Sequence, residues 1–176
     1  GLLDPSQGDS VRRILQNSME TLERIGPEWW CGYSYSWVGG MWARMGDGER
    51  AAAALRDFAQ CFCLKNSFHA NGDQSRSGKS NFTYRPFTLE GNMAFASSLQ
   101  EMLLQSHTGT VRIFPAIPPS WKDVSFRTLR TEGAFLVSAA MRDGKVSEVK
   151  VRSTVGGPLR VLNTFSRPIE AKGVVC

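Results

Sequence analysis

Residues 85–92 read Arg85-Pro86-Phe87-Thr88-Leu89-Glu90-Gly91-Asn92. The chain is organised around this segment, because a polar loop leads into it and an apolar helix follows it. Pro86 favours an extended entry to the helix. Glu90 then lies where the helix begins, beside unpaired backbone N–H groups at the positive end of the helix dipole. A carboxylate held ionised there serves either as a general base or as a helix cap, and the residues alone leave both open.

Composition indicates a globular chain. Of its 176 residues, 41% are hydrophobic and 21% are charged, which excludes a disordered chain and leaves room for a real core. The net charge of +5 comes from lysines and arginines that form no block, so we predict no nucleic-acid partner. No apolar run is long enough to span a bilayer, and we predict no membrane partner.

The cysteines do not suggest a metal site. Cys61 and Cys63 are separated by one residue, which suits neither a zinc pair nor a redox C-x-x-C, and the two histidines are far apart. We therefore predict free thiols, mostly buried, and no metal site. The chain begins at Gly1 without Met, and we expect it to be a piece of a longer protein.

The first 107 residues read as helices. Apolar residues at helical spacing predict a helix over 11–25, with an N-cap signal at Asp9-Ser10 and an end at Gly26-Pro27. Helices over 38–45 and 51–62 are joined by so short a turn that they must form an antiparallel hairpin. A fourth helix runs from Glu90 to about Ser106. Its predicted core stripe consists of Met93, Ala96, Leu99 and Leu103, widened by Phe95 and Met102.

Two loops carry candidate binding residues. The aromatic stretch 28–37 suits either a sugar face or a core between helices, and Trp37 is its best candidate for contact with a sugar. The polar loop 65–84 is unusually long for a compact domain, which is typical of a functional loop. His69, Asn71 and Asp73 are its polar site candidates, with solvated turn residues as the other interpretation.

After His107 the pattern changes to strands. We predict strands over 110–114, 124–131, 134–142, 145–153 and 159–165, with a hairpin turn at Asp143-Gly144. Simple alternation along 124–131 places Val124, Phe126, Thr128 and Arg130 on one face. The fold class is therefore α+β, with a helical region over 1–107 and an antiparallel β domain over 108–176.

Four motifs together resemble one enzyme family. In chain order they are the segment from Cys31-Gly32-Tyr33-Ser34-Tyr35-Ser36-Trp37 through Trp42-Ala43-Arg44-Met45-Gly46-Asp47-Gly48-Glu49-Arg50-Ala51, then Phe87-Thr88-Leu89-Glu90-Gly91-Asn92, then Glu101-Met102-Leu103-Leu104-Gln105-Ser106, and Ile113-Phe114-Pro115-Ala116-Ile117-Pro118. Their order resembles that of glycoside hydrolase family 95, the α-L-fucosidase and α-L-galactosidase family. The resemblance covers nearly the whole chain.

The resemblance implies a parent enzyme with an (α/α)6 catalytic barrel flanked by β domains. This chain would supply the last barrel helices and part of the C-terminal antiparallel β-sheet domain. The parent would be an inverting exo-glycosidase that needs no cofactor, acts on α-L-fucosyl or α-L-galactosyl oligosaccharides or polysaccharides, and is secreted or periplasmic. A non-catalytic carbohydrate-binding relative, or an unrelated interaction domain, is the alternative.

The resemblance also implies roles for individual residues. The family's general base is an Asp in an Asp-Gly-Asn motif, and that position is Glu90 here. Asn92 follows it as in the family, and we expect Asn92 to be a substrate-binding residue. The family's acid Glu lies upstream of Gly1. Glu101 cannot replace it, because it lies about 16 Å farther along the same helix. We therefore expect this fragment alone to be inactive.

Two further expectations concern the fragment itself. His69 is the nearest candidate for the family's His before the base-bearing helix. Four helices cannot close a twelve-helix barrel, which would leave the apolar faces of Met41, Trp42, Phe58 and Phe95 exposed. We therefore expect either self-association or a repacked helical cluster.

Overall fold

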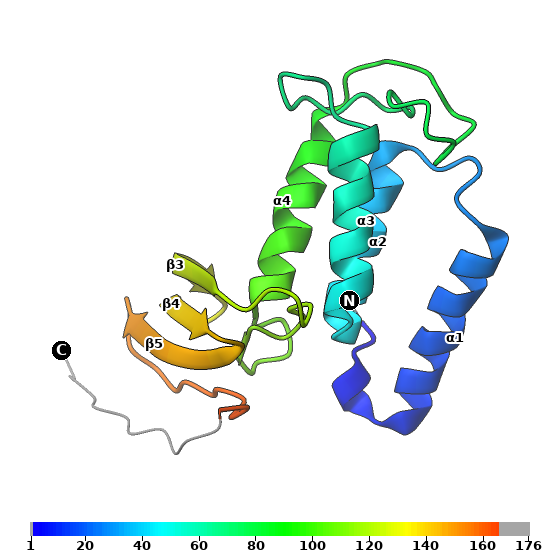
Figure 1. Ribbon diagram of the computed structural model, residues 1–176. Coiled ribbons are helices and arrows are strands. Elements are labelled where there is room, and N and C mark those ends of the chain that lie inside the picture. Colours follow the sequence, from blue (N-terminus) through cyan, green and yellow to red (C-terminus); the bar gives the residue numbers. More distant parts are fainter. Residues whose placement is uncertain (1, 166–176) are drawn as a thin grey trace.

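The computed structural model describes residues 2–165, which fold into a helical part followed by antiparallel β-structure (Figure 1). This arrangement confirms the predicted α+β class. The helical elements are the 3-10 helix η1 (Pro5–Gln7), α1 (Asp9–Ile25), α2 (Gly32–Met45), α3 (Gly48–Cys61) and α4 (Leu89–Leu103). The strands are β1 (Leu104–Gln105), β2 (Arg112–Ile113), β3 (Val124–Thr131), β4 (Phe135–Arg142) and β5 (Lys145–Ser153). Among the described residues, no helix combines the length and apolar character that crossing a bilayer requires.

Turn residues set the predicted helix ends. Gly46 ends α2 in the left-handed conformation, and the Asp47 side chain then accepts the backbone N–H of Arg50 to begin α3. The predicted α2–α3 hairpin is therefore confirmed, as is the end of α1 at Gly26. The predicted N-cap at Asp9-Ser10 is wrong by one residue, because Gly8 occupies the cap position and Asp9 lies in the first turn of α1.

Two other boundaries differ from the sequence prediction. α2 begins at Gly32, so the second half of the predicted aromatic loop is helical. α4 ends at Leu103 rather than near Ser106, because Leu104 and Gln105 form β1 and pair with β2. The long loop between α3 and α4 contains no strand. Two isolated β-bridges hold it in place, one between Cys63 and His69 and one between Ala70 and Phe87.

α2 and α4 run parallel and touch through small residues. The Ser36 hydroxyl donates to the carbonyl oxygen of Gly91 at 3.1 Å, and the Ser98 hydroxyl donates to the carbonyl oxygen of Ser36 at 2.7 Å. A Cβ on Gly40 would lie 2.6 Å from Ser98 Oγ, so the two helix backbones are nearly in contact. Buried hydroxyls that bond to the facing backbone thus replace large side chains at this contact.

This contact changes which face of α4 is buried. The buried residues are Gly91, Ser98 and Met102, whereas Met93 is 59% exposed and Ala96 is also exposed. The predicted stripe through Met93 and Ala96 is therefore wrong in this chain. The predicted stripe was chosen because its residues are apolar. The side of α4 that faces α2 is instead determined by small residues, which let the two helices approach closely.

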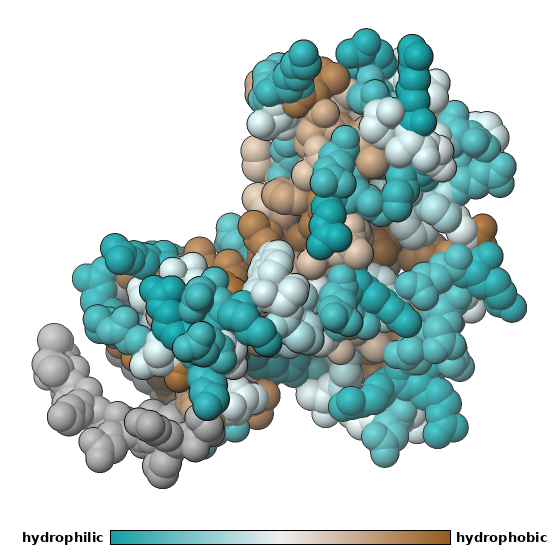
Figure 2. Space-filling view, in the orientation of Figure 1, coloured by the Kyte–Doolittle hydropathy of each residue, from teal (hydrophilic) through white to brown (hydrophobic). Residues whose placement is uncertain are grey.

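The predicted exposed faces are also partly wrong. Trp42 and Phe58 are buried, and Met41 and Phe95 are half-buried, because α1, α2, α3 and α4 pack around them. The exposed apolar residues of α2 and α4 are instead Tyr33, Trp37, Leu89 and Met93. Figure 2 shows apolar side chains along the α4 side of the helical body. The stated reason for self-association therefore fails at Trp42 and Phe58.

The main sheet has the order β3-β4-β5 and is antiparallel throughout. Asp143 and Gly144 both have positive φ, which confirms the β4–β5 hairpin turn. A register shift between Phe126 and Leu129, with Thr128 at φ 58°, breaks the predicted alternation of β3. Phe126 and Thr131 are buried while Thr128 and Arg130 are exposed.

Two predicted strands are shorter or absent. Only Arg112–Ile113 of 110–114 forms a strand, because Pro115 and Pro118 interrupt the region. Residues 159–165 form no strand and make one isolated parallel bridge, from Val161 to Val111. Val161 still packs on the sheet core, beside Val111 and Val137.

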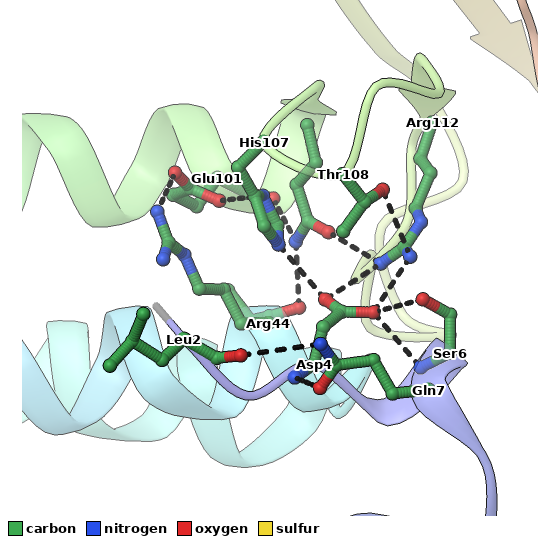
Figure 3. A network of polar contacts seen from close by, with 11 residues as sticks. Leu2, Asp4, Ser6, Gln7, Arg44, Glu101, His107, Thr108 and Arg112 are labelled. Atoms are coloured by element: carbon green, nitrogen blue, oxygen red, sulfur yellow. Dashed lines mark hydrogen bonds and ion pairs between the residues drawn. The ribbon is translucent and has the colours of Figure 1, made fainter.

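A buried polar network holds the N-terminal segment against the end of α4 (Figure 3). Asp4 is 4% exposed, and its carboxylate accepts hydrogen bonds from Arg112 at 2.9 Å and from His107 Nε2 at 2.9 Å. Burial alone would raise the pKa of Asp4, but the bonds from Arg112, Ser6 and His107 outweigh it and hold that pKa well below its usual range. Glu101 belongs to the same region and pairs with Arg44 at 3.0 Å.

We predict that Asp4→Asn lowers the free energy of unfolding by about 2–4 kcal/mol at pH 7, because it removes the charge that Arg112 and His107 face. The folded pKa is depressed, so this stabilisation is present above the ordinary carboxyl pKa of about 4 and declines as the pH falls below it. Denaturant unfolding of both chains between pH 7 and pH 3 measures the difference. Asp9→Asn, at an exposed helix start, should cost less than about 1 kcal/mol. A difference between wild type and Asp4→Asn that grows toward acid pH would contradict the account.

Candidate functional site

Glu90 lies in the first turn of α4, and its side chain is exposed. Thr88 occupies the N-cap position but makes no capping hydrogen bond with its side chain. Among the described residues, no hydrogen bond or ion pair engages the Glu90 carboxylate. No capping hydrogen bond therefore supports the cap interpretation left open by the sequence, and the carboxylate faces solvent beside the positive end of the helix.

The two residues after Glu90 are used for structure. Asn92 Oδ1 accepts the backbone N–H of His69 at 2.9 Å, and Asn92 Nδ2 donates to the carbonyl oxygen of Ser67 at 2.9 Å. Both ends of this amide therefore fasten the long loop to α4. Gly91 leaves space for the ring of His69, because a Cβ at Gly91 would overlap Nδ1 of that ring.

His69 is fully buried and lies between α2 and α4. Its Nδ1 is 2.7 Å from the carbonyl oxygen of Thr88 and 2.7 Å from the Thr88 hydroxyl. Since a carbonyl oxygen only accepts, Nδ1 carries a proton. Nε2 has no hydrogen-bond partner within residues 2–165 and points at Gly32, where a Cβ would overlap it.

This burial changes the role assigned to His69. A ring with no exposed surface contacts no sugar, so the interpretation of His69 as a substrate contact does not fit the structure. His69 instead fixes the residue before α4, and with it the direction in which Glu90 leaves the helix. Two sequence signals pointed to this arrangement, namely the glycines at 32 and 91, since a glycine in a helix marks a close approach.

The remaining loop candidates have different environments. The Asn71 side chain is half-buried, while its backbone bonds to Gly32 and to Pro86, so it joins the loop to the starts of both helices. The Asp73 carboxylate is buried and accepts bonds from Ser75, Ser77 and the Lys79 backbone. Burial opposes the ionised form, but these bonds prevail and lower the pKa of Asp73. Asp73 therefore organises the loop and does not face a ligand.

Trp37 and Glu90 project to the same side of the α2–α4 pair. Ser36 and Gly91 face each other across two parallel helices. Trp37 follows Ser36, and Glu90 precedes Gly91. Each of these side chains is therefore turned by about 100° around its helix axis from the contact, and in parallel helices both turn toward the same open side. Trp37 is 53% exposed. An indole face and a free carboxylate therefore border one surface, which is the arrangement expected of a sugar-binding site with a base.

No metal site accompanies these residues. Within residues 2–165, no three His, Cys, Asp or Glu side chains are grouped closely enough to bind an ion. Cys31, Cys61 and Cys63 are free thiols, and of these Cys61 is buried. Burial raises the pKa of the Cys63 thiol, which disfavours a reactive thiolate. Cys176 lies outside the described residues.

Comparison with known proteins decides the family. Residues 6–103 match the glycosyl hydrolase family 95 catalytic domain, and residues 105–173 match the glycoside hydrolase family 95 C-terminal domain. The chain belongs to glycoside hydrolase family 95. It is also similar to alpha-L-fucosidase 2 of Arabidopsis thaliana, with 30% identity over 130 residues. That alignment covers 73% of this chain and 15% of the plant protein, so the chain spans a small part of this relative's length.

Family 95 membership confirms the resemblance read from the four motifs and agrees with helices followed by β-structure. Our division of the chain between residues 107 and 108 remains a prediction. Glu101 is a poor candidate for the second carboxyl group of a family 95 site, because Arg44 binds it and it lies at the far end of α4 from Glu90.

We predict that Gly91→Ala destabilises the chain by about 2 kcal/mol or more, because the added Cβ overlaps buried His69 and neither α2 nor the loop can retreat easily. The sign of the stability change is informative, because replacing glycine with alanine at an unobstructed helix position would stabilise the chain by up to about 1 kcal/mol. Thermal unfolding measures the change, and Ser97→Ala, at an exposed site of α4, is the matched control. A Gly91→Ala chain as stable as the wild type would refute the close packing described for His69.

Proposed function

We propose that this chain is the C-terminal part of an inverting exo-glycosidase of family 95 in which Glu90 is the general base. The observation that supports this most is the different environment of each residue in the Glu90-Gly91-Asn92 segment. Gly91 and Asn92 are committed to buried contacts, and Glu90 alone presents an unengaged, exposed carboxylate. The substrates proposed are α-L-fucosyl or α-L-galactosyl ends of oligosaccharides or polysaccharides. The name of the plant relative agrees with the first of these.

The proposed step is a single displacement at the anomeric carbon. Glu90 takes a proton from a water molecule, and the water oxygen attacks that carbon from the side opposite the leaving group. The bond from the anomeric carbon to the leaving oxygen breaks, and a carboxylic acid gives its proton to that oxygen. Inverting enzymes hold the two carboxyl groups about 6.5–9.5 Å apart to leave room for the water.

The general acid in this scheme comes from another part of the parent protein. Within the described residues, the other acidic group on α4 is Glu101, and it is held by Arg44. We therefore propose that this chain by itself does not hydrolyse glycosides. The parent would complete the barrel around the open side of α2 and α4, and exposed Leu89 and Met93 would then be covered by barrel helices.

The change from Asp to Glu at the base position adds one methylene, or about 1.5 Å of reach. Within residues 2–165, the exposed Glu90 side chain makes no hydrogen bond or ion pair that the extra length would disturb. Retention of the base role is therefore consistent with the local packing. The secreted or periplasmic location of the parent stays a prediction.

We predict that Glu90→Gln in the complete parent protein lowers kcat on aryl α-L-fucoside or α-L-galactoside by about 10²–10⁴-fold, because glutamine cannot take the proton from water. Steady-state kinetics on a panel of aryl glycosides gives both the loss and the preferred sugar. Glu20→Gln, on the exposed face of α1, should leave kcat within about twofold of the wild type.

Two other results would contradict the proposal. Unchanged kcat in Glu90→Gln would remove Glu90 from the chemistry. Sugar binding without turnover, in both the wild type and the variant, would instead favour the alternative of a non-catalytic carbohydrate-binding relative. In that case Trp37→Ala should weaken binding, because the indole face would still contact the sugar.

A further inference from the structure

The net positive charge of this protein resides in its β part. Residues 1–107 contain 10 Lys and Arg against 11 Asp and Glu, whereas residues 108–176 contain 11 against 5. The sequence suggested scattered cations, but pleating and strand pairing bring several of them together. Hydrophilic side chains gather over the β3–β5 sheet on the face seen in Figure 2.

Register assigns these cations to one face of the sheet. On β4 the residues Leu136, Ser138 and Ala140 point away from the core, since their neighbours Phe135, Val137 and Ala139 are buried. Residues paired directly across a ladder share a face. The outer residues of β5 are therefore Arg152, Lys150 and Glu148, opposite Leu136, Ser138 and Ala140 in that order.

β3 supplies the cations of the other edge. Arg130 pairs with Leu136, and Ser125 pairs with Ala140, so both lie on the same outer face. The bulge after Phe126 is held by the Ser138 hydroxyl, which accepts the backbone N–H of Thr128 at 2.9 Å. Arg127 lies in this bulge and lines the hollow beside Ser138 and Lys150.

The outcome is a trough along β4 with cationic walls, which we call the β4 trough. Its floor consists of Leu136, Ser138 and Ala140, and its walls carry Arg127 and Arg130 on β3 and Lys150 and Arg152 on β5. Neighbouring strands are about 4.8 Å apart, so the two walls stand roughly 10 Å from each other. The part of the trough around Ser138 is a hollow of about 270 Å³.

Most of these cations have no anionic partner. Of the four wall residues, only Lys150 makes an ion pair within residues 2–165, with Glu148 at 2.6 Å. Glu148 is the acidic member among the outer-face residues placed by register, which leaves the trough with net positive charge. Like charges this close repel one another, so an anionic ligand would relieve an existing cost as well as form new contacts.

We propose that the β4 trough binds an acidic polysaccharide, one bearing sulfate or carboxylate groups, with its chain running along β4. Two of the three floor side chains, Ser138 and Ala140, are small and leave room for a flat sugar chain. Guanidinium groups on both sides suit bidentate contacts with sulfate or carboxylate. Single-stranded nucleic acid fits less well, because its binding relies on aromatic stacking and neither floor nor walls contain an aromatic ring. This inference does not depend on Glu90, and it extends the proposed function by a second glycan-binding surface.

The test uses the chain itself, with dextran sulfate as the probe and uncharged dextran as its matched control. We expect binding to dextran sulfate alone, weakening steeply as salt rises from about 20 mM to about 0.3 M, since exposed charges are screened over that range. The triple variant Arg130→Gln, Lys150→Gln, Arg152→Gln should bind at least about tenfold more weakly. All three side chains are exposed, so the fold should be retained, which circular dichroism checks.

A second triple variant, Arg13→Gln, Arg24→Gln, Arg56→Gln, removes the same charge from exposed helical positions. It should change the affinity by less than about twofold if the β4 trough is the site. Equal loss in both triples would show that only net charge matters, and would overturn the proposal, as would no binding of dextran sulfate. Equal or tighter binding of a single-stranded oligonucleotide, lost in the first triple, would reassign the trough to nucleic acid and overturn it too.

Discussion

The close parallel contact of α2 and α4 is the constraint on which the rest of the helical part depends. The hydroxyls of Ser36 and Ser98 donate hydrogen bonds to the backbone of the facing helix. Glycines at this contact let neighbouring atoms approach more closely than any side chain would allow. The buried ring of His69 fills the space between Gly32 and Gly91 at the top of this contact. Asn92 binds the backbone of the loop, and His69 binds Thr88, the residue before α4. The first turn of α4 therefore has little freedom to move. A general base must be held in a fixed position, and this matters more than a hydrogen bond or ion pair to its own carboxylate.

This division of roles explains why a motif can vary at one position and not at its neighbours. Gly91 cannot gain a Cβ without displacing His69, and Asn92 spends both ends of its amide on the loop. Glu90 faces solvent, so a longer carboxylate at this position meets no obstacle within the described chain. Trp37 lies on the same side of the helix pair and is 53% exposed, which agrees with the sugar-binding role that we propose for this surface.

Local chemistry made much of the fold predictable from sequence, and long-range packing made the rest unpredictable. Gly26, Gly46 and the Asp143-Gly144 turn act through their own backbone preferences, and each lies where it was expected. The buried side of α4 and the bulge in β3 depend on partners distant in sequence, so apolar periodicity misplaced both. The same holds for function. Glu90 and Trp37 could be proposed as site residues from residue type and motif, but the burial of His69 and the gathering of Arg130 with Arg152 appear only once strands and helices are paired.

The central claim is that Glu90 removes a proton from the attacking water, and chemical rescue tests it most directly. In the complete protein, Glu90→Gly would leave a space where a small anion such as azide can attack the anomeric carbon in place of activated water. With an aryl glycoside whose leaving group needs little acid assistance, the account predicts that azide restores turnover and that proton NMR finds a glycosyl azide of inverted configuration. A glycosyl azide of retained configuration would mean that Glu90 is the acid–base group of a retaining enzyme and not the base of an inverting one. Undiminished activity without azide would mean that Glu90 is not the base.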